Sequence, residues 1–579
     1  MLHGFIEQRL REAVSAVLPG VKAELIQVRP CPDAKFGDYQ ANSLIALARE
    51  SRLNPRQLAA DVVAKLNVGE WCEKTEIAGP GFINFRLKTE AVAEVLHRAA
   101  CREHLFFDRT KCPRTIIVDF SSPNVAKPMH VGHIRSTILG DCLARTLRLL
   151  GHRVITDNHI GDWGTQFGKL LVGWKRQLDR AALQKEPLAE MERLYKTVNA
   201  ASERNPAILD EARQELVKLQ QGDPENLGLW GEMIAFSQKE FNAVYRRLGV
   251  QFDNTLGESF YGPRLKGVVQ QLLESGLARE SDGAIAVFFD DIPELKSQPA
   301  LIQKSDGAAN YTTTDLATLA YRMETWQPDE IIYVTDGRQQ LHFQQLFAIF
   351  GRWHPGARVK LVHVWFGMIL GKDGKPFKTR TGENIKLSDL LDEAEERAFR
   401  VVSEKNPDLA DSERRDIARV VGLGAIKYSD LLPNRQSDYV FDWDKMLSLA
   451  GNTAPYLQYA YTRIRSIFRK AQESGGAAES SDGPGSEPYI LLAPEEIVLS
   501  KHLLNFGLVL EAVVEDYRPN YLCKYLYELA GHFAGFYENC PVLKSSGQAK
   551  ATRLSLCDLT GRVLKLGLEV LGIATTEKM

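Results

Sequence analysis

The sequence predicts an α/β protein, in which a doubly wound parallel-sheet domain follows a small N-terminal α+β domain and precedes an all-α C-terminal domain. Three observations lead to this prediction. The apolar run Ile116–Phe120 leads through a polar turn into a long amphipathic segment that ends at Gly151. A second apolar run, Arg153–Asp157, follows directly, and beyond Leu387 the spacing of apolar residues is helical to the end. Strand, helix and parallel strand in this order begin an open, Rossmann-type sheet.

Composition limits the class of protein. With 579 residues the chain is too long for a single core, and we expect four segments, residues 1–108, 109–385, 386–445 and 446–579. Hydrophobic content of 44% and charged content of 25% are ordinary for a soluble globular protein. The net charge of −2 excludes a globally basic nucleic-acid binder, although it permits local basic patches.

Cysteine spacing and apolar run length indicate the compartment. The eight cysteines are scattered without a Cys-x-x-Cys pair, which argues against a structural zinc site and against a disulfide framework. No stretch approaches the roughly 18 uninterrupted apolar residues of a membrane span, and the first residues lack the layout of a signal peptide. We therefore expect a cytoplasmic protein in a reducing compartment, with no membrane association and no bound zinc.

The first predicted domain alternates helical and strand-like patterns. Apolar residues from Ile6 to Val17 have helical spacing. The segment Phe36–Asn42 predicts a loop that feeds a helix, and Ala78–Leu87 predicts a strand led by glycines. This mixture is typical of a small α+β domain.

In the sheet domain, the helix that follows Ile116–Phe120 has one largely apolar face, and Gly151 can end it in a left-handed conformation. That face consists of Ile138, Leu139, Cys142, Leu143, Thr146, Leu147 and Leu150. The charged stretch Leu178–Gln251 is helical in pattern and predicts an insertion in the sheet. Further candidate strands are Ala284–Phe289, Glu330–Val334 and Leu361–Phe366. Glu473–Pro488 is rich in Ser, Gly and Ala and predicts a flexible loop or linker.

The turn after the first strand is the most informative motif of the chain. It consists of Pro123, Asn124, Val125, Ala126, Lys127, Pro128, Met129, His130, Val131, Gly132 and His133. Two imidazoles spaced i and i+3 at a helix N-terminus lie on one face, where exposed N–H groups and the helix dipole favour an anion. This indicates a site that binds a nucleotide triphosphate. From the residues alone, half of a metal site or two solvated histidines remain alternatives.

Two loops add weaker signals. Gly161–Gly168 follows the second strand, where an open α/β sheet places ligand contacts, although its glycines also suit a plain turn. Gly371–Gly382 carries four basic residues and three glycines. It is either a solvated surface loop or a clamp on phosphate, in which Lys375 and Lys378 neutralise charge on a departing pyrophosphate.

The order of these motifs resembles a known family. A His-x-Gly-His turn after the first strand and a Lys-x-x-Lys-Thr loop at the end of the sheet are similar to the two signatures of class I aminoacyl-tRNA synthetases. Within that class the chain resembles arginyl-tRNA synthetases of the bacterial type over essentially its whole length. Further matching segments are 36–42, 78–87, 121–136, 161–168, 305–315, 336–342, 456–465 and 563–573. The second signature departs from the usual Lys-Met-Ser-Lys-Ser, but both lysines are kept and Lys127 precedes the histidines.

The resemblance implies a reaction and its partners. Arginine and ATP, accompanied by Mg²⁺, would give arginyl-adenylate and pyrophosphate, and arginine would then pass to the 3′-terminal ribose of tRNA(Arg). Members of the family generally bind tRNA before they activate arginine, and we expect a monomer. Two rival functions are a shorter nucleotidyltransferase that adenylates a cofactor and a synthetase-like protein that binds tRNA without catalysis.

The resemblance also implies residue roles. The catalytic residues would be His130, His133, Lys375 and Lys378, and ATP would in addition contact Lys127 and Gly132. The pocket for arginine would be lined by Asp119, Ser122, Asn124, Tyr311, Asp315 and Gln339. The tRNA would meet Phe36, Asn42, Tyr456, Tyr459 and Arg463, with Tyr461 and Arg465 as further candidates. A guanidinium carries five donors and needs a carboxylate partner, which suits Asp315, although from sequence alone this residue fits a helix N-cap equally well.

Overall fold

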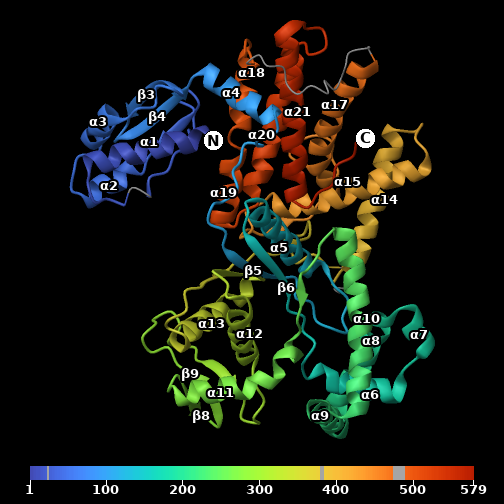
Figure 1. The fold of residues 1–579 in the computed structure, drawn as a ribbon. Coiled ribbons are helices and arrows are strands. Elements are labelled where there is room, and N and C mark those ends of the chain that lie inside the picture. The colour runs from blue at the N-terminus through green and yellow to red at the C-terminus, as the bar shows by residue number, and fades with distance from the viewer. Residues whose placement is uncertain (23–24, 379–383, 474–488) are drawn as a thin grey trace. The chain divides into compact units, whose positions relative to one another are not determined.

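The computed structural model describes residues 1–22, 25–378, 384–473 and 489–579. The chain forms two compact units, whose elements are labelled in Figure 1. The first combines Met1–Arg109, Leu449–Glu569 and Ala574–Met579, and the second combines Thr110–Ser448 with Val570–Ile573. The predicted linker Glu473–Pro488 lies outside the described residues apart from Glu473, and so does the end of the basic loop, residues 379–382.

The N-terminal part of the first unit is an antiparallel sheet with helices. The sheet has the order β1-β2-β4-β3, with bounds β1 Arg29–Pro30, β2 Tyr39–Ala41, β4 Phe82–Leu87 and β3 Cys72–Ala78. The helices are α1 Leu2–Val17, α2 Leu44–Glu50, α3 Pro55–Lys65 and α4 Thr89–Ala100. The predicted helix near the start and the predicted strand after Ala78 are confirmed. The prediction for Phe36–Asn42 was wrong in part, because β2 pairs with β4 between the loop and α2.

The rest of the first unit is helical, as predicted. Its helices are α17 Ala454–Glu473, α18 Pro494–Leu503, α19 Phe506–Asp516, α20 Asn520–Asn539 and α21 Gly547–Val570, and α17, α18 and α19 all pack on α20. The stretch Pro494–Asp516 is apolar and long enough to cross a membrane by composition, and half of its most apolar window is buried inside the protein. It comprises two helices rather than one, and Leu499, Leu503 and Leu510 are fully buried in the helical core.

The second unit contains the predicted parallel sheet. Its order is β12-β11-β5-β6-β7, with bounds β12 Lys360–His363, β11 Glu330–Val334, β5 Thr115–Phe120, β6 Arg153–Asn158 and β7 Asn254–Thr255. All four strand pairs are parallel. Helix α5 (Val131–Leu149) joins β5 to β6 and packs on both. Gly140 allows this close approach, because a Cβ there would lie 2.2 Å from Cγ of Phe120.

The predicted insertion is helical. It consists of α7 Arg180–Lys185, α8 Pro187–Arg204, α9 Pro206–Gln220 and α10 Pro224–Leu248. Helices α8, α9 and α10 pack with the preceding α6 Gln166–Gln177, and α7 packs on α8. The predicted strand at Ala284 exists as β9 Ala284–Val287, but it is not part of the parallel sheet. It pairs antiparallel with β8 Ala278–Ser281 and β10 Ala300–Gln303 in a separate sheet.

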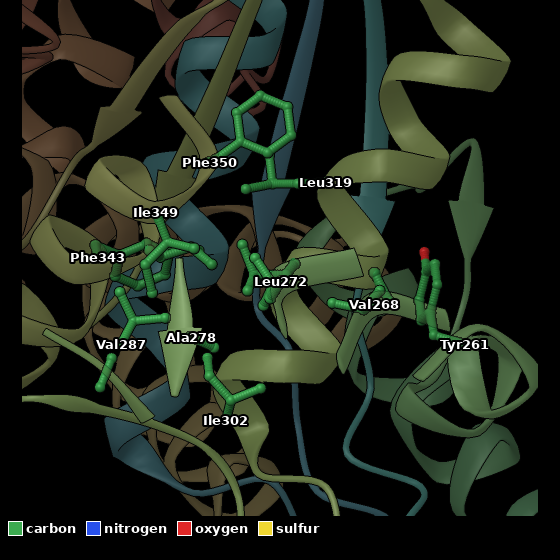
Figure 2. Close-up of a cluster of buried hydrophobic side chains, with 14 of the residues drawn as sticks. Tyr261, Val268, Leu272, Ala278, Val287, Ile302, Leu319, Phe343, Ile349 and Phe350 are labelled. Carbon is green, nitrogen blue, oxygen red and sulfur yellow. The ribbon is translucent and has the colours of Figure 1, made fainter. Parts of the chain in front are cut away.

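One large hydrophobic cluster joins this small sheet to the parallel sheet. It contains Val287 and Ile302 of the small sheet, Ile117 and Ile331 of the parallel sheet, and Leu319 of α12. Figure 2 shows its side chains from α11 (Leu265–Glu274), α12 (Tyr311–Trp326) and α13 (Gln340–Trp353) gathered around Leu272. The cluster fixes α12, whose N-terminal end carries two of the predicted site residues, Tyr311 and Asp315.

The last part of the second unit follows the basic loop. Helices α14 Leu387–Lys405 and α15 Asp411–Leu431 pack against each other and on α5, and α16 Trp443–Met446 follows. The prediction of helices alone beyond Leu387 was wrong at one place. There the short strand β14 (Tyr439–Val440) pairs in parallel with β13 (Ile369–Leu370), directly before the basic loop.

Candidate active site

Four segments with candidate site residues leave the carboxyl ends of neighbouring parallel strands. They follow β5 at Ser121, β6 at His159, β7 at Leu256 and β11 at Thr335. In an open α/β sheet this edge is where ligands bind, because the helices leave a crevice there. The sequence therefore directs its candidate residues to one edge of one sheet.

The histidine pair forms the first turn of α5. His130 is the N-cap, and its Nδ1 accepts a hydrogen bond from the Gly132 N–H (3.0 Å). The Nδ1 of His133 accepts from the His130 N–H (3.1 Å), and the ring centroids are 4.1 Å apart. Because each Nδ1 is an acceptor, the proton of each neutral ring is on Nε2. Both rings can therefore donate one hydrogen bond from Nε2.

Burial keeps these rings neutral. It lowers the pKa of His133 to about 3, with a further contribution from His130. It also lowers the pKa of His130, to which the nearby Lys127 contributes. At neutral pH the pair consequently supplies N–H donors without adding positive charge.

The histidines line a cavity of about 700 Å³ that is rich in lysine. Its walls come from the motif, from α6 and α8, from Lys378 of the basic loop and from the residues that follow this loop. They comprise Asn124, Val125, Ala126, Lys127, Pro128, His130, His133, Gln166, Leu170, Glu192, Tyr195, Lys196, Lys378, Asn384 and Lys386. Among the described lining residues, four lysines and two imidazole donors face a single carboxylate, and this balance suits a phosphate chain.

The structure separates the two lysines of the basic loop. Lys378 lines the cavity together with His130 and His133, whereas Lys375 is exposed and is not among the lining residues. Lys375 is part of a tight turn, in which its carbonyl accepts from the Gly371 N–H (2.7 Å). The sequence pattern treats the two lysines alike, and only the fold distinguishes them.

The segment that follows the basic loop, residues 384–387, is hydrogen-bonded to the histidine turn. The Val131 N–H donates to the Ile385 carbonyl, and the Leu387 N–H donates to the Met129 carbonyl, each at 2.9 Å. The N-cap residues of α5 and α14, His130 and Lys386, are thereby paired in an antiparallel bridge. Lys386 was not predicted as a site residue, because nothing in its local sequence marks it.

Asp315 and its neighbours occupy the start of α12. Asp315 is not the N-cap of this helix, because Asn310 holds that position. The Oδ2 of Asp315 contacts Nε2 of His342 at 2.6 Å. Tyr311 is 60% exposed and its ring meets the His342 ring edge-on at 4.8 Å between centroids. Gln339 is exposed on the short turn that precedes α13. The carboxylate is therefore presented by a rigid helix rather than used to cap it.

Asp119 belongs to a buried ionic group. Its Oδ2 accepts from Nη2 of Arg322 (2.6 Å), which also donates to Oδ2 of Asp157 (2.8 Å). The other oxygen of Asp119 accepts from the Ser122 hydroxyl (3.2 Å). Arg322 is completely buried, and the two aspartates are register partners at the ends of β5 and β6. One carboxylate oxygen of Asp119 is therefore used in a hydrogen bond with the buried Arg322.

The loop that connects β5 to the histidines is strained and packed. Ser121, Ser122 and Ala126 all have positive φ, between 46° and 75°. Asn124 pairs with Gly161 of the second predicted loop, where a Cβ would lie 2.3 Å from the Asn124 Oδ1. Such strain persists only where the surroundings over-determine the backbone, and it is concentrated at functional sites.

Glu258 is a site residue that the sequence did not reveal. It follows β7, and its pKa is raised to about 8 by burial, by Asp315 and by Asp162. Burial also raises the pKa of Asp162, which accepts two hydrogen bonds from Ser259. The available signal was an acid just beyond a parallel strand, but a strand of two residues is too short to recognise. A carboxyl group whose pKa is raised by burial and by neighbouring carboxyl groups is a candidate site residue.

Two of the candidate tRNA contacts are occupied by the protein itself. The Tyr461 hydroxyl donates to Glu577 (2.8 Å), and Arg465 also pairs with Glu577 (2.9 Å). Other candidates are accessible. Tyr459 is 45% exposed, Phe36 is 49% exposed, and Asn42 and Arg463 are exposed. Tyr456 is partly buried and packs against Tyr527.

Among the described residues, no group of three or more His, Cys, Asp and Glu side chains is arranged to hold a metal ion.

Comparison with family models finds three matches. Residues 96–443 match the class I tRNA synthetase (R) catalytic domain, 457–579 the DALR anticodon binding domain, and 4–87 the arginyl tRNA synthetase N-terminal domain.

Individual proteins match along their whole length. The chain is 46% identical to the arginine–tRNA ligase of Klebsiella pneumoniae strain 342, covering 99% of this chain and 100% of the relative. It is 45% identical to that of Citrobacter koseri, covering 96% of each. Among solved structures, Thermus thermophilus arginyl-tRNA synthetase matches with a TM-score of 0.84 at 27% identity, covering 100% of both chains. The Plasmodium falciparum synthetase matches with a TM-score of 0.81 at 30% identity, covering 100% of this chain and 99% of that one.

Proposed function

The chain belongs to the arginyl-tRNA synthetase family and ligates arginine to tRNA at the expense of ATP, and from this premise we propose which residues carry out each step. In the first step an oxygen of the arginine carboxylate attacks the α-phosphorus of ATP, and the bond to pyrophosphate breaks. No side-chain nucleophile takes part, so catalysis consists of positioning and of charge stabilisation.

The lysine-rich cavity is the proposed ATP phosphate site. The Nε2–H groups of His130 and His133 donate to phosphate oxygens, and Lys127 and Lys378 neutralise charge as pyrophosphate departs. The observation that supports this role is the hydrogen bonding of both Nδ1 atoms, which leaves both Nε2–H groups available in the cavity. Lys386 adds a positive charge beside the histidines, because its backbone is paired with His130 and the residue lines the cavity.

The arginine guanidinium lies between Asp315 and Glu258 in this proposal. A permanently charged, planar fork needs carboxylates in its plane, and Asp315 acts on Glu258 electrostatically, raising the pKa of that carboxyl group. Tyr311 adds an aromatic wall, while Asp119, Ser122, Asn124 and Gln339 line the remainder. An uncharged amino acid would leave a carboxylate unpaired, and this accounts for selection of arginine without an editing site.

In the second step a hydroxyl of the terminal ribose attacks the carbonyl carbon of the adenylate, and AMP departs. We assign anticodon contact to Tyr459, Arg463 and Tyr456 of α17, through stacking of unpaired bases on the tyrosines. Phe36, with Lys35 4.8 Å above its ring, and Asn42 contact the tRNA from the N-terminal domain. Tyr461 and Arg465 instead hold the C-terminal residues of the chain.

Several broader features belong to the same proposal. ATP enters as its Mg²⁺ complex, since this ion prefers phosphate oxygens to an all-protein cage. The protein acts as a cytoplasmic monomer without membrane attachment. The four segments expected from the sequence are the functional domains, with residues 109–385 catalytic and residues 1–108 and 446–579 bound to tRNA.

The first experiment measures amino-acid-dependent exchange of pyrophosphate into ATP with all twenty amino acids, with and without tRNA. Exchange with arginine alone supports the assigned pocket, and exchange only after tRNA is added identifies tRNA as part of the active site. Exchange with another amino acid would refute the assignment of Asp315 and Glu258. Binding of a tRNA by Tyr459→Ala, compared with Tyr461→Phe as the control, tests the anticodon surface separately.

A further inference from the structure

We propose that Tyr195, on the helical insertion, is a positioning residue that holds the Lys127 ammonium group in the phosphate cavity. The inference rests on the proposed role of Lys127 and extends it to α8, to which neither the motifs nor the comparisons assign a part in activation. The Nζ of Lys127 lies 5.6 Å from the centroid of the Tyr195 ring, and both residues line the cavity.

The insertion holds the strained loop at three points. The hydroxyl groups of Tyr245 and Ser121 are hydrogen-bonded at 2.8 Å. The Ala126 N–H donates to the hydroxyl of Ser237, a fully buried residue of α10, at 2.9 Å. Tyr195 is the third point. The first contact holds the Ser121 side chain at the start of the loop, the second holds the backbone at Ala126, and the third reaches the Lys127 side chain.

A ring is a suitable partner for this lysine. Lys127 is exposed, and a lysine has four rotatable side-chain bonds, so an unrestrained ammonium would sample many positions. An aromatic face attracts a cation without neutralising it, whereas a carboxylate would consume the charge needed for phosphate. Among the wall residues that the structure describes, the one carboxylate, Glu192, pairs with Lys196 at 2.9 Å, and the Lys127 ammonium lies over the Tyr195 ring.

The arrangement suggests different roles for the two lysines. Lys127 is held by the insertion before ATP arrives, whereas Lys378 belongs to the basic loop that follows β13. Loss of the Tyr195 ring should therefore weaken the use of ATP and leave the arginine requirement unchanged. A merely structural role for Tyr195 would alter both.

The test is steady-state pyrophosphate exchange with tRNA present, measured for Tyr195→Leu, Tyr195→Phe, Lys127→Met and the double variant Tyr195→Leu with Lys127→Met. Tyr195→Leu should lower kcat/KM for ATP by roughly two- to thirty-fold, as expected for a cation–π contact, with KM for arginine unaltered. Tyr195→Phe should recover most of that loss. With Lys127→Met in place, Tyr195→Leu should add less than about twofold, because residues that act through one another are not additive.

Each alternative result has a distinct meaning. An equal loss from Tyr195→Leu with and without Lys127, or no recovery by Tyr195→Phe, overturns the inference. A Lys127→Met variant with full activity overturns the proposed role of Lys127 and the inference with it, while leaving the arginine assignment intact. Leu227→Ala, an exposed change on α10, controls for non-specific effects. Thermal melting checks folding, and Tyr195→Met replaces the leucine variant if that variant melts early.

Discussion

Arginine binding should release close to one proton at pH 7. Burial, Asp315 and Asp162 raise the pKa of Glu258 to about 8, so at pH 7 about nine in ten empty molecules carry this carboxyl protonated. The guanidinium of arginine is charged at every accessible pH. Its arrival beside Glu258 favours the carboxylate, and the proton leaves to the solvent.

The magnitude follows from linkage. Below pH 8 the ligand must displace a proton, so the apparent dissociation constant for arginine should rise about tenfold for each unit by which pH falls. Above pH 8 the carboxylate is already formed, and the affinity should become independent of pH. Isothermal titration calorimetry at pH 7, in two buffers with different ionisation enthalpies, measures the number of protons released.

Two variants make the assignment specific. Glu258→Gln should bind arginine more weakly and should release no proton. Asp315→Asn removes the neighbouring charge that raises the pKa of Glu258, so it should release less than the wild type at pH 7. Binding of arginine to the wild type without proton release, or equal release from Glu258→Gln, would refute the reasoning.

Three further predictions concern the phosphate cavity and the core beneath the sheet edge. Lys378→Met should lower kcat for pyrophosphate exchange by about 10²–10³-fold, the loss expected when one preorganised charge-stabilising group is removed. Lys375→Met should lower the same kcat by less than about tenfold. Equal losses in kcat would contradict the separation of the two lysines. The pKa of His133 is lowered to about 3, so the folded state binds fewer protons than the unfolded state, and His133 should remove stability at about 1.4 kcal/mol per pH unit as pH falls from 6.5 towards 3. Urea titrations of His133→Asn should show a shallower pH dependence, and an identical slope would argue against a neutral, buried ring. Arg322→Met should lower the free energy of unfolding by about 3–5 kcal/mol, because two buried aspartates lose their partner; a loss below about 1 kcal/mol would contradict the buried ion pairs.

Local pattern was sufficient to predict most of the elements. The strand–helix–strand unit, the helix end at Gly151 and the helical insertion all follow from apolar spacing over neighbouring residues, and the structure contains them. The errors have a common cause. Residues of β2 look like part of a loop, and β9 looks like part of the main sheet, because strand partners are chosen across the fold and not within the segment.

The candidate site divides in the same way. The histidine turn could be recognised from sequence because its function depends on the first turn of one helix, whose geometry is set by adjacent residues. Asp315 could be placed on a helix face for the same reason.

The remaining site residues depend on packing between distant segments. The role of Glu258 depends on Asp315, more than fifty positions along the chain, and that of Tyr195 on α8 depends on Lys127 in the turn before α5. Lys386 enters the site through its backbone pairing with His130, and Lys375 is left out of the cavity although its sequence environment resembles that of Lys378. The sequence alone determined the family, the sheet and the histidine turn, because these depend on short-range spacing. Tertiary structure alone decided which charges share the cavity and which carboxyl groups lie near Glu258, because electrostatic interaction depends on distance and burial in space, and neither is encoded by position along the chain.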